Sequence, residues 1–106
     1  MMKFGLREET IKRICGVFAD YPQIEKAVIY GSRAKGNYKK GSDIDLVLEG
    51  RDLNLSVLQS LLLDLDDLML PCMFDISFYD QINNPDLIAH IRRVGKIFYE
   101  RMNPDG

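Results

Sequence analysis

The segment from residue 43 to residue 48 constrains the fold more than any other part of the sequence. Its side chains alternate between two faces, with Ile44, Leu46 and Leu48 on one and Asp43, Asp45 and Val47 on the other. Alternation with a period of two is typical of a β-strand that buries one face. Such a strand needs neighbouring strands for its backbone hydrogen bonds and a second layer to cover its apolar face. The segment therefore predicts a sheet with one buried face.

Other segments supply the remaining elements. Strand-length apolar runs are Ala27–Tyr30, Met73–Tyr79 and Ile97–Tyr99, the last being either a short final strand or a packing tail. Apolar residues at helical spacing predict helices over about 7–20 (Ile11, Ile14, Cys15, Phe18), about 53–69 (Leu55, Leu58, Leu62, Leu65, Met69) and from Asn84-Pro85 onward (Leu87, Ile88, Ile91). This order predicts an α/β (α+β) fold with a small mixed sheet that is backed by helices.

Length and composition limit the class of protein. The 106 residues, 46% hydrophobic and 28% charged, predict one domain over 1–106 and leave no room for a separate substrate-binding domain. The formal net charge is −2 and no long basic run is present, which argues against direct nucleic-acid binding. No signal peptide or membrane-spanning apolar run is seen, so we expect a cytoplasmic protein without membrane contact.

Three carboxylates are the candidate catalytic and metal-binding residues. Asp43 and Asp45 point to the same face of their strand, with Cα atoms ~7 Å apart. Hard oxygen ligands at this spacing suit Mg²⁺, which completes its shell with substrate phosphates, and can serve a two-ion site. Asp75 alternates with the apolar residues of its own strand. If that strand pairs beside the strand at 44–48, Asp75 joins the same face and can also accept a proton.

Gly31-Ser32 is the candidate phosphate-binding turn. It ends the run at 27–30 and begins a polar stretch that we expect to form a short helical turn and a loop. Glycine allows close backbone approach to phosphate, and Ser32 adds a hydroxyl donor. Arg33, with Lys35, Lys39 and Lys40, offers positive charge near a triphosphate.

Each of these features also has an ordinary structural explanation. Gly-Ser after a strand is commonly a turn, Asp-x-Asp a solvated strand face, and loop lysines are commonly solvated. We expect packing or surface roles for His90 and Tyr38, solvation for the acidic cluster at Asp64, Asp66 and Asp67, and a buried free thiol for Cys15. The combination of Gly31-Ser32, Asp43, Asp45 and Asp75, in this order and on these elements, favours a functional site.

The segments Val28–Gly36 and Gly41–Leu46 resemble the minimal nucleotidyltransferases, the MNT family. The shared features are Gly-Ser, a short spacer, Asp-x-Asp and a later strand Asp, and the order of elements matches over nearly the whole chain. The resemblance implies a polymerase-β-like fold, an NTP such as ATP held by Gly31 and Ser32, and Mg²⁺ bound by Asp43, Asp45 and Asp75.

The resemblance also implies a partner. Similar proteins are paired with a HEPN-type helical protein, in many cases an RNase toxin, and act as antitoxins, in some systems by attaching AMP to a tyrosine of the toxin. We expect this activity, with homo- or hetero-oligomers possible. Two alternatives remain: a non-catalytic nucleotide-binding module that sequesters a helical partner, and a transferase for a small molecule. The intact set of Asp43, Asp45 and Asp75 favours catalysis, because a pure binding protein does not need such crowded charge.

Overall fold

The sheet is small and mixed. The computed structural model describes residues 2–101, and its main sheet has the strand order β5-β4-β3-β6. The strands are β3 (Ile24–Tyr30), β4 (Ile44–Gly50), β5 (Phe74–Phe78) and β6 (Lys96–Glu100). β4 is parallel to β5 and antiparallel to β3, which is antiparallel to β6. The predicted α/β fold with a mixed sheet is confirmed, and the segment at 97–99 is a true strand.

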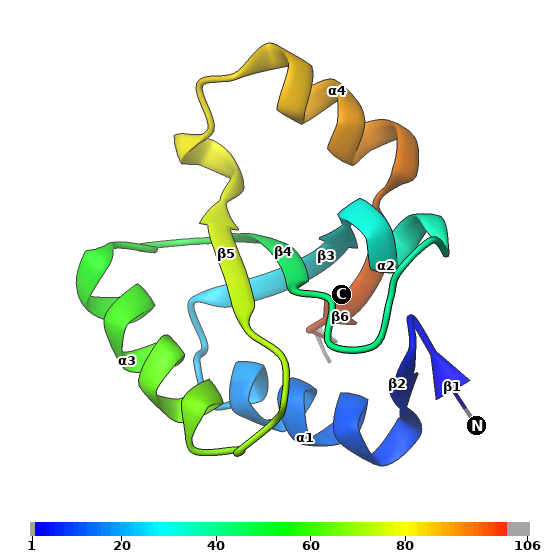
Figure 1. Cartoon of the computed structure of the whole chain (residues 1–106). Helices are drawn as coiled ribbons and strands as arrows, with labels where there is room; N and C mark the ends of the chain where they lie inside the picture. The colour runs from blue at the N-terminus through cyan, green and yellow to red at the C-terminus, as the bar shows by residue number, and fades with distance from the viewer. Residues whose placement is uncertain (1, 102–106) are drawn as a thin grey trace.

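Helices cover both faces of this sheet (Figure 1). α1 (Glu8–Ala19) and α3 (Leu55–Asp66) pack on one face, and α4 (Pro85–Val94) packs on the other. The larger core joins Ile14 and Phe18 of α1 to Leu61 and Leu65 of α3 and to the inward residues of β3, β4 and β5. The smaller core joins Ile91 of α4 to the opposite face of the sheet. β4 is therefore buried on both faces, which fixes its position.

The apolar stripe predicted for the helix after β4 is wrong in part. Leu61 and Leu65 are the buried positions of α3, whereas Leu55 is 67% exposed and Met69 is 86% exposed. The helix ends at Asp66, three residues before Met69, so Met69 lies outside it. Apolar residues occur around the whole helix, and several stripes therefore fit the sequence equally well. Packing against α1 selects the one that is buried.

An N-terminal hairpin was not expected from the sequence. β1 (Met2–Lys3) pairs antiparallel with β2 (Leu6–Arg7) through a turn at Phe4 and Gly5. Both turn residues have positive φ, 58° and 73°. Strands of two residues carry no periodic pattern, so Gly5 is the one local signal of the turn.

The start of α4 follows the sequence closely. The side chain of Asn84 caps the helix, since Oδ1 accepts hydrogen bonds from the backbone N–H of Asp86 at 2.9 Å and of Leu87 at 3.4 Å. Pro85 occupies the first helical position and Gly95 follows the last. A 3-10 turn (Tyr79–Gln81) connects β5 toward this helix. Within residues 2–101, no helix combines the length and apolar character needed to span a membrane.

Candidate functional site

Asp45 and Asp75 lie directly beside each other. The parallel register of β4 and β5 pairs Asp45 with Asp75, and neighbouring strands are ~4.8 Å apart. The flanking residues Leu46 and Ile76 point into the larger core, so both carboxylates point to the opposite face, the one that carries α4. The predicted pairing of these two strands is confirmed.

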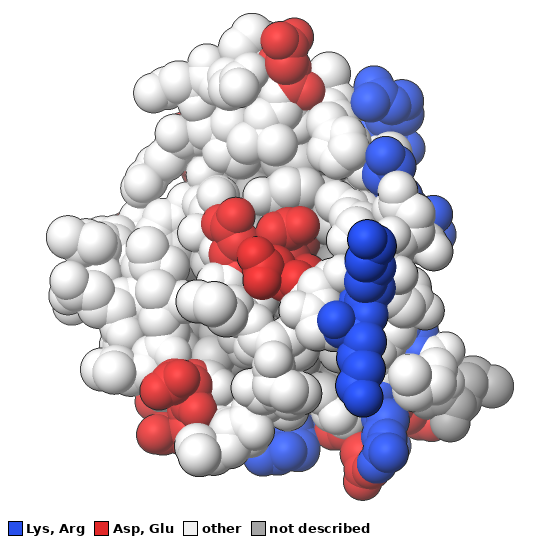
Figure 2. Space-filling model, in the orientation of Figure 1, with Lys and Arg blue, Asp and Glu red and all other residues white. Residues whose placement is uncertain are grey.

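Asp43 joins this acidic group from outside the strand. It is exposed and precedes the first residue of β4. Burial raises the pKa of the Asp45 carboxyl above its usual value, and the negative charges of Asp75 and Asp43 raise it further. Figure 2 shows acidic side chains gathered at the centre of one face of the molecule, with a column of basic side chains beside them on the side of α2 (Gly31–Lys35). Asp75 and Asp43 therefore act electrostatically on Asp45, and basic side chains flank the acidic patch.

Gly31 packs against Asp45. Its φ is 73°, in the left-handed region, and a Cβ placed on Gly31 would collide with Oδ2 of Asp45. Only glycine fits this position without strain or displacement of the carboxylate. Ser32 follows as the second residue of α2 and is half-buried. The Gly31-Ser32 turn thus lies against one of the carboxylates predicted to bind metal.

Arg33 lies inside the protein. Its side chain is 4% exposed, and its guanidinium donates hydrogen bonds to the carbonyl oxygen of Ser42 (from Nε at 3.0 Å and Nη2 at 2.7 Å) and to that of Phe4 (from Nη1 at 2.9 Å). The Tyr38 ring lies 5.6 Å from the guanidinium carbon. The positive charge of Arg33 is among the influences that lower the pKa of Asp45. Arg33 is therefore close to the acidic group but bonded to backbone, an arrangement the sequence did not indicate.

Two further residues adjoin the carboxylates and were not predicted as site residues. Tyr30 is the partner of Asp45 across β3 and β4, and it is 8% exposed. Burial raises the pKa of the Tyr30 phenol, and the charges of Asp75 and Asp45 add to the rise. The ring of His90 on α4 meets the Tyr30 ring edge-on, with centroids 6.2 Å apart. His90 thus makes a packing contact with Tyr30. The position of Tyr30 directly before Gly31 is the sequence signal that could have identified it as a neighbour of the site.

The remaining candidates have structural explanations. Cys15 is a free, half-buried thiol that donates to the carbonyl of Phe98 at 3.5 Å, and burial raises the pKa of this thiol. Asp64 is exposed and accepts a hydrogen bond from the Tyr21 hydroxyl at 2.6 Å. Tyr38 is 39% exposed on the loop after α2.

The acidic group can be tested against the requirements of magnesium. Among residues 2–101, no three His, Cys, Asp or Glu side chains are grouped so that they could hold a metal ion by themselves. Mg²⁺ commonly takes only one or two carboxylates and completes its shell with water and phosphate oxygens. Asp45 and Asp75, paired on one face and mutually repelling, fit that smaller requirement. The assignment of Asp43, Asp45 and Asp75 as metal ligands stays a prediction.

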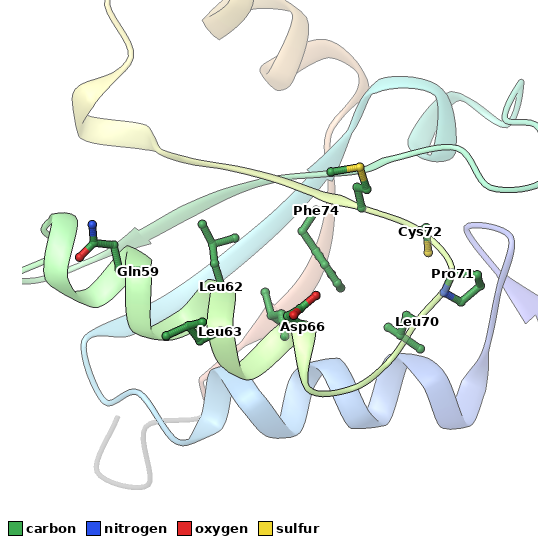
Figure 3. Close-up of a pocket in the computed structure, with 10 residues that line it drawn as sticks. Gln59, Leu62, Leu63, Asp66, Leu70, Pro71, Cys72 and Phe74 are labelled. Atoms are coloured by element: carbon green, nitrogen blue, oxygen red, sulfur yellow. The ribbon is translucent and has the colours of Figure 1, made fainter.

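A separate cavity lies on the other face of the sheet (Figure 3). It has a volume of about 750 Å³ and lies between α3 and the segment leading into β5, with Leu62, Leu63 and Phe74 among its lining residues. Phe74 is the neighbour of Asp75 on β5 and points the opposite way. None of the predicted site residues lines this cavity.

Comparisons with known proteins agree with this fold. Residues 11–103 match the family described as "Polymerase beta, Nucleotidyltransferase". A toxin–antitoxin complex crystallised with AMP-PNP is similar at a TM-score of 0.71 and 19% identity, over 87% of this chain and 74% of that chain. A complex of a tri-AMPylated Shewanella oneidensis HEPN toxin with an MNT antitoxin is similar at a TM-score of 0.67 and 16% identity, over 91% and 74%. Curated protein sequences give no match. The predicted polymerase-β-like fold is confirmed.

Proposed function

This chain belongs to the polymerase β nucleotidyltransferase family, and we propose that it transfers AMP from ATP to a hydroxyl group on a partner protein. The observation that carries the proposal is the direct pairing of Asp45 with Asp75, together with the close packing of Gly31 against Asp45. In this reaction the acceptor oxygen bonds to the α-phosphorus of ATP, the bond to the β-phosphate oxygen breaks, and pyrophosphate leaves.

The residues of the site have distinct roles in this proposal. Gly31 and Ser32 hold the triphosphate, because the turn is open to close approach and Ser32 carries a hydroxyl donor. Asp45 and Asp75, with Asp43, hold Mg²⁺, which when bound offsets the negative charge of the phosphates. Asp75 is the more exposed of the paired carboxylates, and it accepts the proton of the attacking hydroxyl.

The proposed acceptor is a tyrosine of a HEPN-type helical protein, for which this chain is the antitoxin. Two kinds of support exist: the MNT-like motif, and the similarity of the fold to complexes that contain an AMPylated HEPN toxin or AMP-PNP. We propose that the chain works as a single domain in the cytoplasm and that the partner contributes the acceptor.

Intact-mass measurement of the partner tests this function. After incubation of the co-purified HEPN-type partner with this protein, ATP and Mg²⁺, we expect a mass gain of one or more AMP groups. Asp45→Asn is the matched inactive variant, and EDTA should also abolish the gain. A cognate partner that binds the protein but keeps its mass would contradict the proposed transfer.

The cavity beside α3 supports the alternative function, a non-catalytic nucleotide-binding module that sequesters a helical partner. Leu63 and Met73, which line it, are exposed, as is Met69 on the segment after α3, and exposed apolar side chains of this kind are typical of a surface that binds another protein. A non-catalytic module that sequesters a helical partner would use such a surface. In that case Asp45→Asn would neutralise the toxin as well as the wild type does, whereas the proposed enzyme would lose its protective effect.

A further inference from the structure

A buried arginine links the N-terminal hairpin to the segment that carries Asp43. Arg33 donates two hydrogen bonds to the carbonyl oxygen of Ser42, the residue before Asp43, and one to the carbonyl oxygen of Phe4 in the hairpin turn. Burial of a guanidinium is unfavourable unless its donors are satisfied, so these bonds are maintained in the folded state. Arg33 thereby fixes the backbone on the N-terminal side of Asp43.

Asp43 needs such support because it lies outside the sheet. The positions of Asp45 and Asp75 follow from the register of β4 and β5. Asp43 precedes β4, and its C-terminal side is fixed where the backbone N–H of Ile44 donates to the carbonyl of Met73 at 2.8 Å. On its N-terminal side, Ser42 closes a local turn with Lys39 and accepts the bonds from Arg33.

Gly5 of the hairpin turn packs closely against the guanidinium of Arg33. Gly5 has a φ of 73°, and a Cβ there would come within 2.8 Å of Nη1 of Arg33 and 2.5 Å of the Tyr38 ring. The turn therefore requires glycine at position 5, which lies against Arg33 and Tyr38. The hairpin turn thus contacts the same guanidinium that bonds to Ser42.

We propose that Arg33 is a positioning residue that holds Asp43 in place for metal-assisted nucleotide binding, with the N-terminal hairpin as its support. This inference rests on the proposed nucleotidyl transfer. In this inference Arg33 makes no direct contact with the triphosphate, which differs from the expectation based on sequence. The reason is that Arg33 is 4% exposed and its guanidinium is bonded to two carbonyl oxygens.

The chain provides a matched control for the test. Arg101 donates to the carbonyl oxygens of Ile24, Ala19 and Tyr21 at 3.0–3.2 Å, at the opposite end of β3 from Gly31. Arg33→Lys and Arg101→Lys each keep the charge and lose the fork of donors. The probe is AMP-PNP binding by calorimetry over a series of Mn²⁺ concentrations and in EDTA, at a temperature where both variants are folded.

For Arg33→Lys we expect at least tenfold weaker AMP-PNP binding at limiting Mn²⁺, partial recovery at high Mn²⁺, and unchanged binding in EDTA. Arg101→Lys should lower the melting temperature without changing the Mn²⁺ dependence. Gly5→Ala, which keeps Arg33 but crowds it, should shift the Mn²⁺ dependence in the same direction and serves if Arg33→Lys does not fold.

Three results would overturn the inference. Unchanged Mn²⁺ dependence in Arg33→Lys and Gly5→Ala would make Arg33 a purely structural residue. If Arg33→Lys weakened AMP-PNP binding equally in Mn²⁺ and in EDTA, Arg33 would instead contact the phosphates directly. Wild-type protein that binds AMP-PNP equally well with Mn²⁺ and EDTA would refute the metal-assisted function itself, a result distinct from the first two because it appears before any substitution is made.

Discussion

Replacing Asp75 with asparagine separates a catalytic carboxylate from a structural one. Asp75 is paired with Asp45 in register, and at ~4.8 Å two unit charges repel by roughly 0.9 kcal/mol in water and ~3.5 kcal/mol at an effective dielectric constant of ~20. Asp75 is exposed, so the lower value applies, and we expect metal-free Asp75→Asn to gain about 1 kcal/mol. For a protein of this size that corresponds to a melting temperature about 4 °C higher.

The same substitution should remove nucleotidyl transfer. Losing a preorganised electrostatic group at the reacting centre commonly reduces the rate by about a hundredfold or more. The assay pairs the metal-free melting temperature, followed by circular dichroism, with the rate of AMP transfer to the partner in Mg²⁺. A lower melting temperature with residual activity that tracks the folded fraction would refute the reasoning, because it would make Asp75 a structural residue.

Three other changes test the site and the fold. Gly31→Ala should destabilise the protein by roughly 1–2 kcal/mol and abolish nucleotide binding, because it forces a side chain into a left-handed position against Asp45; denaturant unfolding and calorimetry measure both. Asn84→Ala should cost about 1 kcal/mol through loss of the α4 cap and leave nucleotide binding unchanged. Because the pKa of Asp45 is raised in the folded state, its own contribution to metal-free stability should fall as pH rises from the ordinary value of 3.8 through the raised one; the melting temperature of the wild type relative to Asp45→Asn should therefore decrease over this range, and an increase would contradict the raised pKa.

The sequence by itself determined β4 and β5 and the direction of their side chains. The alternation at 43–48 and at 74–78 places the carboxylates opposite the aliphatic residues, because a strand turns successive side chains to opposite faces whatever its neighbours are. The Asn84-Pro85 cap is equally local, since the bonding groups lie within three residues. Gly31 was predicted as a turn residue for the same reason.

Only the tertiary structure decided which of these residues meet. The contact between Asp45 and Asp75 depends on the parallel pairing of strands thirty residues apart, and no local pattern specifies a register. The burial of Arg33 depends on the carbonyl oxygens of Phe4 and Ser42, which any sequence could offer. The buried stripe of α3 was mispredicted because several apolar stripes exist on one helix and packing against α1 selects among them. Backbone carbonyl acceptors and alternative apolar stripes on a helix cannot be identified from the sequence, because the packing of distant segments determines which of them is used.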